Sequence, residues 1–347
     1  MYKYQSKKGE QMSGLKGKHL VTGVAGMIGS HLARRLVGDG YKVVGVDNLS
    51  SGSVKNIHDL MLSNFNKGGF RFIEGDLRDF EFCIKVIQGV NFVWSLAANM
   101  GGIGFITSVH ANIMRDNALI NLNMLEAARM HKASRYFYSS SACAYAEHYQ
   151  LKPDVAPLKE SDAYPAMPDQ SYGWEKIFTE QACVAYQKDY GMNIRIARFH
   201  NIYGAAFTAF DKQRGKAPCH LIIKALRHPN PPFEIWGDGE STRSFLYIDD
   251  CIGGMLKLMA SDFSEPINIG SDRLISVNGL AGIIIGISGK DITPKYDPSK
   301  PQGVRGRNAD LTLARQVLGW EPKVSLEDGL ERVYRWAEEH FSELENI

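Results

Sequence analysis

The sequence predicts an α/β fold in which a doubly wound parallel sheet is joined to a smaller mixed α/β lobe. Two observations lead to this prediction. Between residues 19 and 198, short apolar strands alternate with helices, a pattern typical of a parallel sheet that helices cover on both faces. After Asn201 the alternation stops, and segments rich in Gly, Ala, Pro and polar residues follow. A chain of 347 residues is long enough for one large domain and a smaller lobe.

The expected elements follow one another at short intervals. The expected strands are residues 19–22, 41–46, 70–74, 92–97, 135–139, 193–198 and 267–269. The expected helices are residues 30–38, 80–88, 113–131, 172–190, 218–227 and 248–259. We expect residues 15–200 and 247–272 to form the sheet domain, and residues 201–246 and 273–347 to form the lobe.

Composition and charge exclude several classes of protein. A net charge of +2 gives no broad attraction to nucleic acid or to a membrane surface. No apolar run approaches the roughly 18 residues that a membrane span needs, and Met1–Gln11 lacks the apolar core of a signal peptide. The cysteines are Cys83, Cys143, Cys183, Cys219 and Cys251. Their scattered spacing predicts no disulfide framework and no metal site, and reduced thiols fit the cytoplasm.

A glycine-rich turn joins the first strand to the first helix. Gly23, Gly26 and Gly29 are spaced G-x-x-G-x-x-G, with Met27 and Ile28 between the last two. The first glycine permits a tight turn, the second lets backbone N–H groups approach a pyrophosphate, and the third lets the helix pack on the sheet. A purely structural turn is the alternative, but this position favours a dinucleotide-binding Rossmann fold.

The ends of the next three strands complete the expected cofactor site. Asp47 ends the second strand, where a carboxylate can accept both ribose hydroxyls and would repel a 2′-phosphate, which favours NAD over NADP. Asp76 and Leu77 follow the third strand and could meet the adenine, although an ordinary strand-end aspartate is a comparable explanation. The small run Leu96, Ala97 and Ala98 leaves room for a bound cofactor.

A serine, a tyrosine and a lysine follow in the order expected for hydride transfer to a nicotinamide. Tyr172 and Lys176 are four residues apart and share a helix face, so the ammonium can favour the tyrosinate. Ser141 could hold the substrate hydroxyl for this tyrosine. Cys143 lies two residues further on, and a thiol there suggests proton transfer to and from carbon. A small packing residue is the alternative for Cys143.

Longer segments resemble the extended short-chain dehydrogenase/reductase family over residues 17–335. The segments that carry the resemblance are 97–105, 139–143, 198–204, 214–218, 236–239, 242–245 and 303–308. Within the family, the Met100–Gly102 loop, the Ser-Ala-Cys at 141–143 and the Lys-Ala-Pro at 216–218 are similar to nucleotide-sugar epimerases that act at carbons 3 and 5 of GDP-mannose. The resemblance implies that the sheet domain binds NAD and the lobe binds the nucleotide sugar.

The resemblance also implies a reaction and the residues that perform it. Tyr172 and NAD oxidise carbon 4, and the ketone acidifies the hydrogens on carbons 3 and 5. Cys143 then acts as the base and Lys216 as the acid, before the ketone is reduced again. Arg243 and Arg305 would hold the pyrophosphate, and Trp236 would pack under the nucleotide. The implied substrate-binding residues are Met100, Gly101, Gly102, Ser141, Ala142, Cys143, Asn201, Lys216, Ala217, Lys224, Trp236, Ser241, Arg243 and Arg305.

Several positions depart from the pattern of those epimerases. Gly215 stands where they have a glutamate, and Asn99 replaces an aspartate. A 4-epimerase or 4-dehydrogenase of another nucleotide sugar would use Ser141, Tyr172 and Lys176 without needing Cys143. A 4,6-dehydratase is disfavoured because no Asp-Glu pair follows Ser141. An intact Ser, Tyr and Lys set argues against a non-catalytic NAD-sensing regulator.

Two long helices predict a homodimer. Their apolar residues occupy more than one side, and a helix that is apolar beyond its core stripe needs a second partner. The residues are Ile113, Leu119, Ile120, Leu122, Met124 and Leu125 in helix 113–131, and Ile177, Phe178, Val184 and Tyr186 in helix 172–190. In related enzymes this helix pair forms a four-helix bundle across a two-fold axis. A wide core that absorbs these side chains is the alternative.

Overall fold

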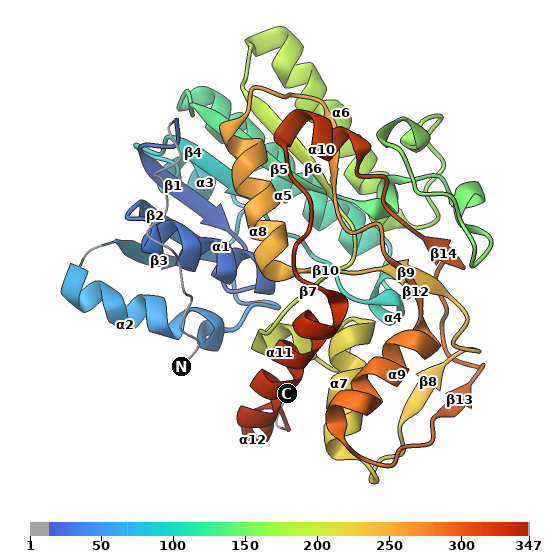
Figure 1. Cartoon of the computed structure of the whole chain (residues 1–347). Helices are drawn as coiled ribbons and strands as arrows, with labels where there is room; N and C mark the ends of the chain where they lie inside the picture. Colours follow the sequence, from blue (N-terminus) through green and yellow to red (C-terminus); the bar gives the residue numbers. More distant parts are fainter. Residues whose placement is uncertain (1–13, 68, 346–347) are drawn as a thin grey trace.

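The computed structural model describes residues 14–67 and 69–345 and contains a seven-stranded central sheet (Figure 1). Its strands are β1 (Lys18–Thr22), β2 (Lys42–Asp47), β3 (Phe70–Glu74), β4 (Phe92–Ser95), β5 (Arg135–Ser141), β6 (Ile194–Phe199) and β11 (Pro266–Ile269). They lie in the order β11-β6-β5-β4-β1-β2-β3, and each neighbouring pair is parallel. The predicted fold class is confirmed. The expectation for Met1–Gln11 lies outside the described residues.

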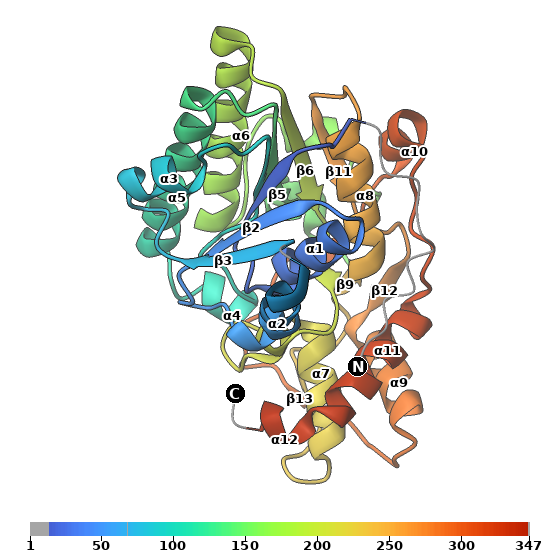
Figure 2. The same cartoon turned by 90° about the vertical axis from the view of Figure 1, so that its left-hand side faces the viewer.

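Helices cover both faces of the sheet (Figure 2). One face carries α3 (Phe80–Val86), α5 (Ala111–Met130) and α6 (Ser171–Tyr190), and the other carries α1 (Met27–Gly38) and α8 (Ile248–Ala260). Alternate residues of a strand point to opposite faces, so Leu20 joins the core under α5 and α6 whereas Val21 joins the core under α1 and α8. The continuous apolar strands of the sequence reflect this burial on both faces.

Some elements differ from the sequence prediction at their ends. Helix α1 begins at Met27, three residues before the predicted start, and β5 continues to Ser141, two residues beyond its predicted end. Helices α2 (His58–Lys67) and α4 (Ile103–Ile106) were not predicted. Helix α4 has only four residues, too few for a periodic pattern.

The lobe packs below the sheet in Figure 1 and shares the core that lies under α1 and α8. Its larger helices are α7 (Ala217–Arg227), α9 (Val277–Ser288) and α11 (Leu326–Glu339), and α12 (Phe341–Leu344) is shorter. Helix α10 (Thr312–Leu318), which belongs to the predicted lobe segment 273–347, packs instead beside the sheet against β11 and α8 (Figure 1). Its short strands are β8 (Glu234–Trp236), β9 (Thr242–Ser244), β12 (Leu274–Ser276), β13 (Lys295–Asp297) and β14 (Gly306–Arg307). A further parallel pair of strands consists of β7 (Ile202–Tyr203), which follows β6, and β10 (Leu246–Tyr247), which precedes α8.

The strand order reverses between β1 and β4. The chain runs outward from β1 to β2 and β3, then returns to β4 on the other side of β1. In open parallel sheets the crevice beyond the carboxyl ends of such strands is the usual place for a ligand. In the described ranges no helix is both long enough and apolar enough to cross a membrane.

Candidate active site

A cavity of ≈ 360 Å³ opens at this reversal point, beyond the ends of the central strands. The predicted site residues that line it are Gly23, Gly26, Met27, Ile28, Gly29, Asp47, Asp76, Leu77, Leu96, Ala97, Ala98, Met100, Ser141, Tyr172, Asn201 and Lys216. The predicted residues outside this lining are Gly101, Gly102, Ala142, Cys143, Lys176, Ala217, Lys224, Trp236, Ser241, Arg243 and Arg305. The cavity thus brings the glycine turn together with Ser141, Tyr172 and Lys216.

In the glycine turn, neither Gly23 nor Gly29 has room for a Cβ. Gly23 has a φ of +64°, and a Cβ on Gly29 would lie 2.2 Å from the carbonyl oxygen of Gly23. Gly26 precedes α1 as its N-cap, so the positive end of the helix and its unpaired N–H groups face the cavity. This backbone cradle fits a pyrophosphate, as the sequence predicted.

The carboxylate of Asp47 is held at the end of β2. It accepts hydrogen bonds from the backbone N–H groups of Ala25 (3.0 Å) and Leu49 (2.9 Å). Burial raises its pKa, and those bonds act in the opposite direction. Asp76 also lines the cavity, but Arg78 pairs with it at 2.7 Å and lowers its pKa to about 2. The only strong cation beside the two acids in the described lining is therefore already paired.

On the side of the cavity expected to bind the cofactor, the hydroxyl of Thr22 holds the backbone that follows β4. Thr22 Oγ1 accepts hydrogen bonds from the backbone N–H groups of Leu96 (3.0 Å) and Ala97 (3.1 Å). A Cβ on Gly23 would lie 2.9 Å from the Cα of Ala97, so β1 and β4 approach closely here. The small residues after β4 leave this edge of the sheet open to a flat ligand. Together with the glycine turn and Asp47, they fit NAD.

Tyr172 and Lys176 meet the end of β5. The Nζ of Lys176 donates a hydrogen bond to the Ser139 carbonyl (3.0 Å) and lies 5.3 Å from the centroid of the Tyr172 ring. Burial raises the pKa of Tyr172 well above its usual value, and a hydrogen bond with Ser141 acts in the opposite direction. The hydroxyls of Ser141 and Tyr172 thus converge on one point of the cavity, as the sequence predicted.

Cys143 lies on a single turn, η2 (Ala142–Ala144), that follows β5 directly. Its backbone N–H donates to Ser141 Oγ (3.1 Å), which fixes the thiol relative to the serine. Nη1 of Arg307 lies 3.4 Å from Sγ of Cys143. A buried guanidinium thus lies within hydrogen-bonding distance of the Cys143 sulfur.

Lys216 comes from the opposite part of the fold, as the N-cap residue of α7. Burial lowers the pKa of its ammonium, and the charge of Cys143 acts in the opposite direction. A lysine with a lowered pKa gives up its proton more readily near neutral pH, as a general acid must. The two residues are therefore close enough for their charges to interact.

The backbone before Lys216 is tied to the Met100–Gly102 loop. The N–H of Gly102 donates to the carbonyl of Arg214 (2.9 Å), and a Cβ on Gly102 would lie 2.3 Å from the carbonyl oxygen of Gly215. Arg214 Nη1 donates to Asn99 Oδ1 and to the Met100 carbonyl, both at 3.1 Å. The loop therefore positions the segment that carries Lys216.

Other predicted substrate-binding residues surround this centre. Nδ2 of Asn201 donates to the Ser244 carbonyl (2.9 Å), and Arg243 Nη2 donates to the Val304 carbonyl (2.6 Å). Burial lowers the pKa of Arg243 to about 9, helped by Arg307. Nζ of Lys224 lies 5.8 Å from the centroid of the Trp236 ring.

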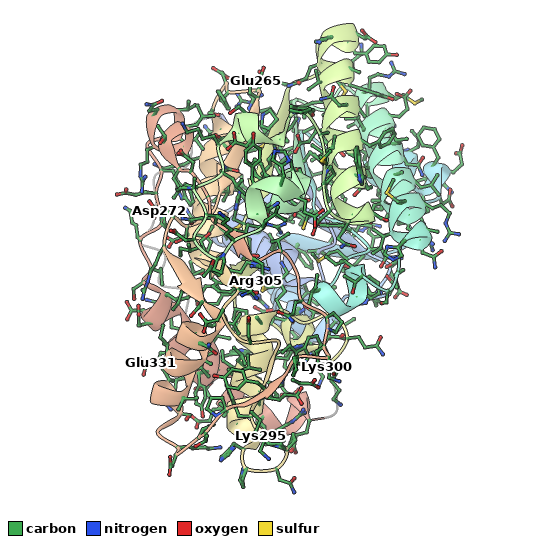
Figure 3. The ribbon with its side chains drawn as sticks, turned by 90° about the vertical axis from the view of Figure 1, so that its right-hand side faces the viewer. Glu265, Asp272, Lys295, Lys300, Arg305 and Glu331 are labelled. Atoms are coloured by element: carbon green, nitrogen blue, oxygen red, sulfur yellow. The ribbon has the colours of Figure 1, made fainter. Side chains whose placement is uncertain are left out.

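Arg305 has a different environment from that of its neighbour Arg307. Its two terminal nitrogens each lie 3.0 Å from an oxygen of Asp238. Figure 3 shows it between the sheet domain and the lobe. Arg307, which the sequence analysis passed over, pairs in register with Arg243 between β14 and β9 and contacts Cys143. The sequence signal for it was its place within the segment 303–308 that carries the family resemblance.

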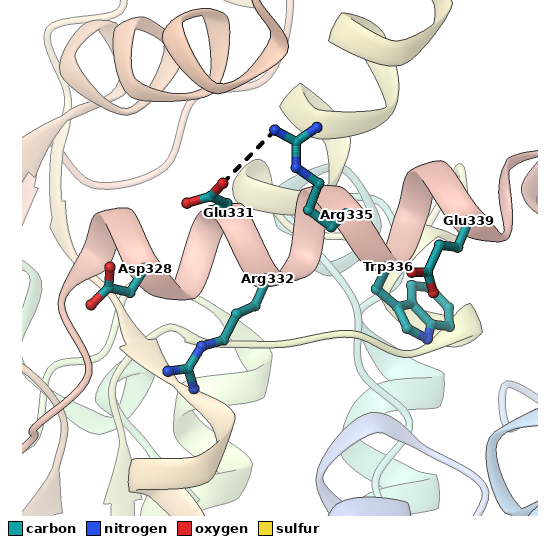
Figure 4. Close-up of a pocket in the computed structure, with 6 residues that line it drawn as sticks. All are labelled: Asp328, Glu331, Arg332, Arg335, Trp336 and Glu339. Atoms are coloured by element: carbon teal, nitrogen blue, oxygen red, sulfur yellow. Dashed lines mark ion pairs between the residues drawn. The ribbon is translucent and has the colours of Figure 1, made fainter. Parts of the chain in front are cut away.

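A second hollow, of ≈ 350 Å³, lies on the outer surface of α11 (Figure 4). Its lining residues are Asp328, Glu331, Arg332, Arg335, Trp336 and Glu339. All of them belong to one helix, and Glu331 pairs with Arg335 at 3.8 Å. This charged helix face brings together no strand ends and none of the predicted site residues.

The fold and site define an NAD-dependent enzyme built on an extended short-chain dehydrogenase/reductase frame. A family model, described as the NAD dependent epimerase/dehydratase family, matches residues 19–270. The chain belongs to this family, which confirms the predicted resemblance and NAD as cofactor.

Two curated relatives are GDP-mannose 3,5-epimerases. The enzyme named GDP-mannose 3,5-epimerase 1 from Oryza sativa subsp. japonica is 47% identical over 92% of this chain and 81% of its own length. The GDP-mannose 3,5-epimerase of Arabidopsis thaliana is 46% identical over the same shares.

Solved structures of related enzymes have the same fold. A UDP-glucose 4-epimerase from Thermotoga maritima, solved with UDP-glucose, has a TM-score of 0.83 at 30% identity and covers 93% of this chain and 99% of its own. A UDP-glucuronic acid 4-epimerase from Bacillus cereus, solved with UDP-glucuronic acid and NAD, has a TM-score of 0.78 at 30% identity over the same shares.

Proposed function

We propose that this chain is an NAD-dependent nucleotide-sugar epimerase that acts on GDP-mannose at carbons 3 and 5. The observation that carries the proposal is that two sets of groups lie close together: Ser141, Tyr172 and Lys216 line one cavity, and Cys143 lies just outside that lining on the turn that follows Ser141. Ser141 and Tyr172 supply the parts for oxidation at carbon 4, whereas Cys143 and Lys216 supply a base and an acid that such an oxidation does not need. The names of the relatives at 46–47% identity support the same substrate.

Ser141, Tyr172 and Lys176 act first in the proposed reaction. Ser141 holds the hydroxyl on carbon 4, and Tyr172 takes its proton with the help of the Lys176 ammonium. NAD, which the glycine turn and Asp47 would hold, would supply the acceptor for the hydride of carbon 4 and later its donor. The resulting ketone makes the hydrogens on carbons 3 and 5 acidic, because the charge left behind spreads onto the ketone oxygen.

Cys143 and Lys216 then invert the neighbouring carbons. The Cys143 thiolate removes a proton from carbon, and Lys216 donates one to the other face of the same carbon. Arg307, with Nη1 3.4 Å from Sγ, holds the Cys143 side chain in place for the transfer. Tyr172 finally returns its proton to the oxygen on carbon 4 when the ketone is reduced.

We propose the same division of labour for the two parts of the chain that the sequence suggested. Residues 15–200 and 247–272 would bind NAD, and residues 201–246 and 273–347 would bind the nucleotide sugar. Arg243 and Arg307 are adjacent on β9 and β14, where two guanidinium groups suit a pyrophosphate. Arg305 remains a predicted contact for the same group.

A 4-epimerase of another nucleotide sugar is the second candidate. The likeness to the Thermotoga maritima enzyme favours it, but that reaction assigns no role to Cys143 or Lys216. The two candidates differ in where they exchange hydrogen with water. We expect GDP-mannose incubated in D₂O to gain deuterium at carbons 3 and 5, located by NMR. Inversion at carbon 4 alone, without deuterium at its neighbours, would establish the 4-epimerase instead.

We also propose a homodimer in the cytoplasm. Large apolar side chains stay exposed on the outer surface of α5 and α6: Leu119 at 41%, Trp174 at 46% and Phe178 at 47%. A second copy of this helix pair would cover them. Light scattering should give twice the 38.7 kDa of one chain, and a single-chain mass at micromolar concentration would contradict the dimer. The free cysteines of the described residues suit a reducing compartment.

A further inference from the structure

A buried carboxylate lies directly beside the Tyr172–Lys176 pair. Glu175 is 0% exposed, although it has no role in the reaction proposed above. Its Oε1 accepts hydrogen bonds from Nδ2 of Asn121 and Oγ1 of Thr179, both at 2.8 Å. Its Oε2 has no hydrogen-bond partner among the described residues and lies 3.8 Å from Nζ of Lys176. One oxygen is thus fixed by α5 and α6, and the other is directed at the catalytic lysine.

Glu175 and Lys176 therefore form a buried pair of opposite charges. Lys176 is 1% exposed, so its ammonium and the Glu175 carboxylate both have little access to water. An isolated buried charge costs several kcal/mol, and a neighbouring opposite charge offsets much of that cost. Without Glu175, the whole field of the ammonium would act on the Tyr172 ring 5.3 Å away. Glu175 cancels part of that field.

The other groups around Tyr172 come from several elements. From β5, Ser141 bonds to its hydroxyl, and the ring centroid of Tyr138 lies 5.0 Å from Nζ of Lys176. Cys143 on η2 adds a second negative charge when ionised. The contacts from α4 and α5 are apolar, through Ile106 and Ile113.

One further titratable side chain stands near the start of α6. His110 contacts Ser171 at 3.5 Å, next to Tyr172 in sequence, but it is exposed and therefore screened by water. Among the described residues packed around the pair, Glu175 is thus the buried acid that lies against Lys176. After burial and Cys143, its charge is the next contribution that raises the pKa of Tyr172.

We propose that Glu175 is a positioning residue that balances the charge of Lys176 and keeps the proton on Tyr172. The inference rests on the proposed function, in which a ketone forms at carbon 4 and must persist while carbons 3 and 5 are inverted. A protonated Tyr172 can donate a hydrogen bond to the ketone oxygen, where negative charge gathers when carbon 3 or 5 loses its proton. A permanently ionised tyrosine could not donate that bond.

The Glu175→Gln variant tests this inference through its pH profile. The glutamine keeps the shape and the bonds to Oε1 but removes the charge. A negative charge near a phenol disfavours the phenolate, so its removal lowers the pKa of Tyr172. We expect the acidic limb of the kcat/KM profile for deuterium exchange to move to lower pH by about one unit. An unmoved limb, whatever the loss of rate, would reduce Glu175 to a structural residue and overturn the proposal.

Thr179→Val is the matched control. It removes one of the two bonds to Glu175 Oε1 but leaves the carboxylate in place. We expect its acidic limb to stay within a few tenths of a unit of the wild-type position. A limb that moves as far as in Glu175→Gln would mean that packing and not charge sets the profile.

Thermal unfolding provides a readout that needs no substrate and no activity. We expect Glu175→Gln and Lys176→Met to lower the melting temperature singly, and the double variant to lose less than the sum, because it leaves no unbalanced charge. Losses that simply add would overturn the charge balance. Because this cycle does not involve GDP-mannose, it separates a failure of this inference from a failure of the proposed function, which would appear as an inactive wild type.

Discussion

The two sides of the cavity are held by different kinds of contact. On the cofactor side each contact holds a backbone group: Gly29 fits against the carbonyl of Gly23, and the short Thr22 side chain accepts from the backbone N–H groups after β4. On the substrate side they are made by long side chains: Arg214 bonds to Asn99 and the Met100 carbonyl, and Arg307 reaches Cys143. Backbone contacts tolerate few substitutions, whereas side-chain contacts can be exchanged singly.

This difference explains how one frame can serve several reactions. The 4-epimerase structures at 30% identity have the same fold, so the sheet and its glycine turn do not by themselves determine which carbon reacts. The groups that would decide this for our chain, Cys143 and Lys216, lie on η2 and before α7, outside the glycine turn. Changes on the two sides should therefore have different consequences.

The largest effect is expected on the substrate side, for Cys143→Ala. Loss of a proton-transfer group lowers the rate by about 10²–10⁴-fold. Deuterium uptake at carbons 3 and 5, followed by NMR, should fall by that factor while NAD stays bound. Cys219→Ala, which removes a thiol from the cavity lining, is the matched control and should exchange nearly as fast as wild type. Wild-type exchange in Cys143→Ala would exclude the thiol as the base.

Lys216→Ala should produce a loss of similar size, about 10²-fold or more, in kcat. The partly buried ammonium is expected to supply the proton on the face opposite Cys143, so its removal should stop inversion at both carbons. Steady-state kinetics distinguish this role from simple anion binding. A raised KM with an unchanged kcat would make Lys216 a binding residue and not the acid.

Gly29→Ala is the corresponding test of the cofactor side. Its Cβ would lie 2.2 Å from the carbonyl oxygen of Gly23, so the turn must move. Overpacking of this kind costs about 1–3 kcal/mol. We expect a lower melting temperature and NAD lost on gel filtration. Gly38→Ala, in open space at the end of the same helix, should retain NAD and be as stable as wild type or slightly more so. Equal behaviour of the two variants would mean that the turn is not a tight cradle.

Two arginines of one short segment provide a smaller, paired test on the substrate side. Arg307 contacts Cys143, whereas both terminal nitrogens of Arg305 face Asp238. Changing each arginine to lysine keeps the charge but removes the planar guanidinium group with its paired N–H donors. We expect deuterium exchange to fall about tenfold in Arg307→Lys, the size of a lost charge-assisted hydrogen bond, and less in Arg305→Lys. A larger loss of deuterium exchange in Arg305→Lys than in Arg307→Lys would mean that Arg305, and not Arg307, is the more important arginine for the reaction.

The same contrast explains what could be predicted from the sequence. Gly23 to Gly29, Asp47 and the Tyr172–Lys176 pair depend on spacing within one turn, strand or helix, and all of them were found. Arg307 was missed because its neighbours are set by the register of β14 against β9, which joins residues far apart in the chain. The Arg305–Asp238 pair spans 67 residues, and Glu175 has a role only because Asn121 approaches from another helix.

The smallest effect concerns the choice between NAD and NADP. Asp47 occupies the end of β2 with its carboxylate fixed by two backbone N–H groups, and Arg78 is already paired with Asp76. A 2′-phosphate would therefore meet like charge, and the described lining offers no free cation beside Asp47, so apoenzyme should bind NADP at least about tenfold more weakly than NAD by calorimetry. Asp47→Asn keeps the size of the side chain and removes the repulsion, and we expect it to narrow the preference severalfold. Comparable affinities in the wild type, or an unchanged ratio in Asp47→Asn, would show that another part of the cofactor side makes the choice.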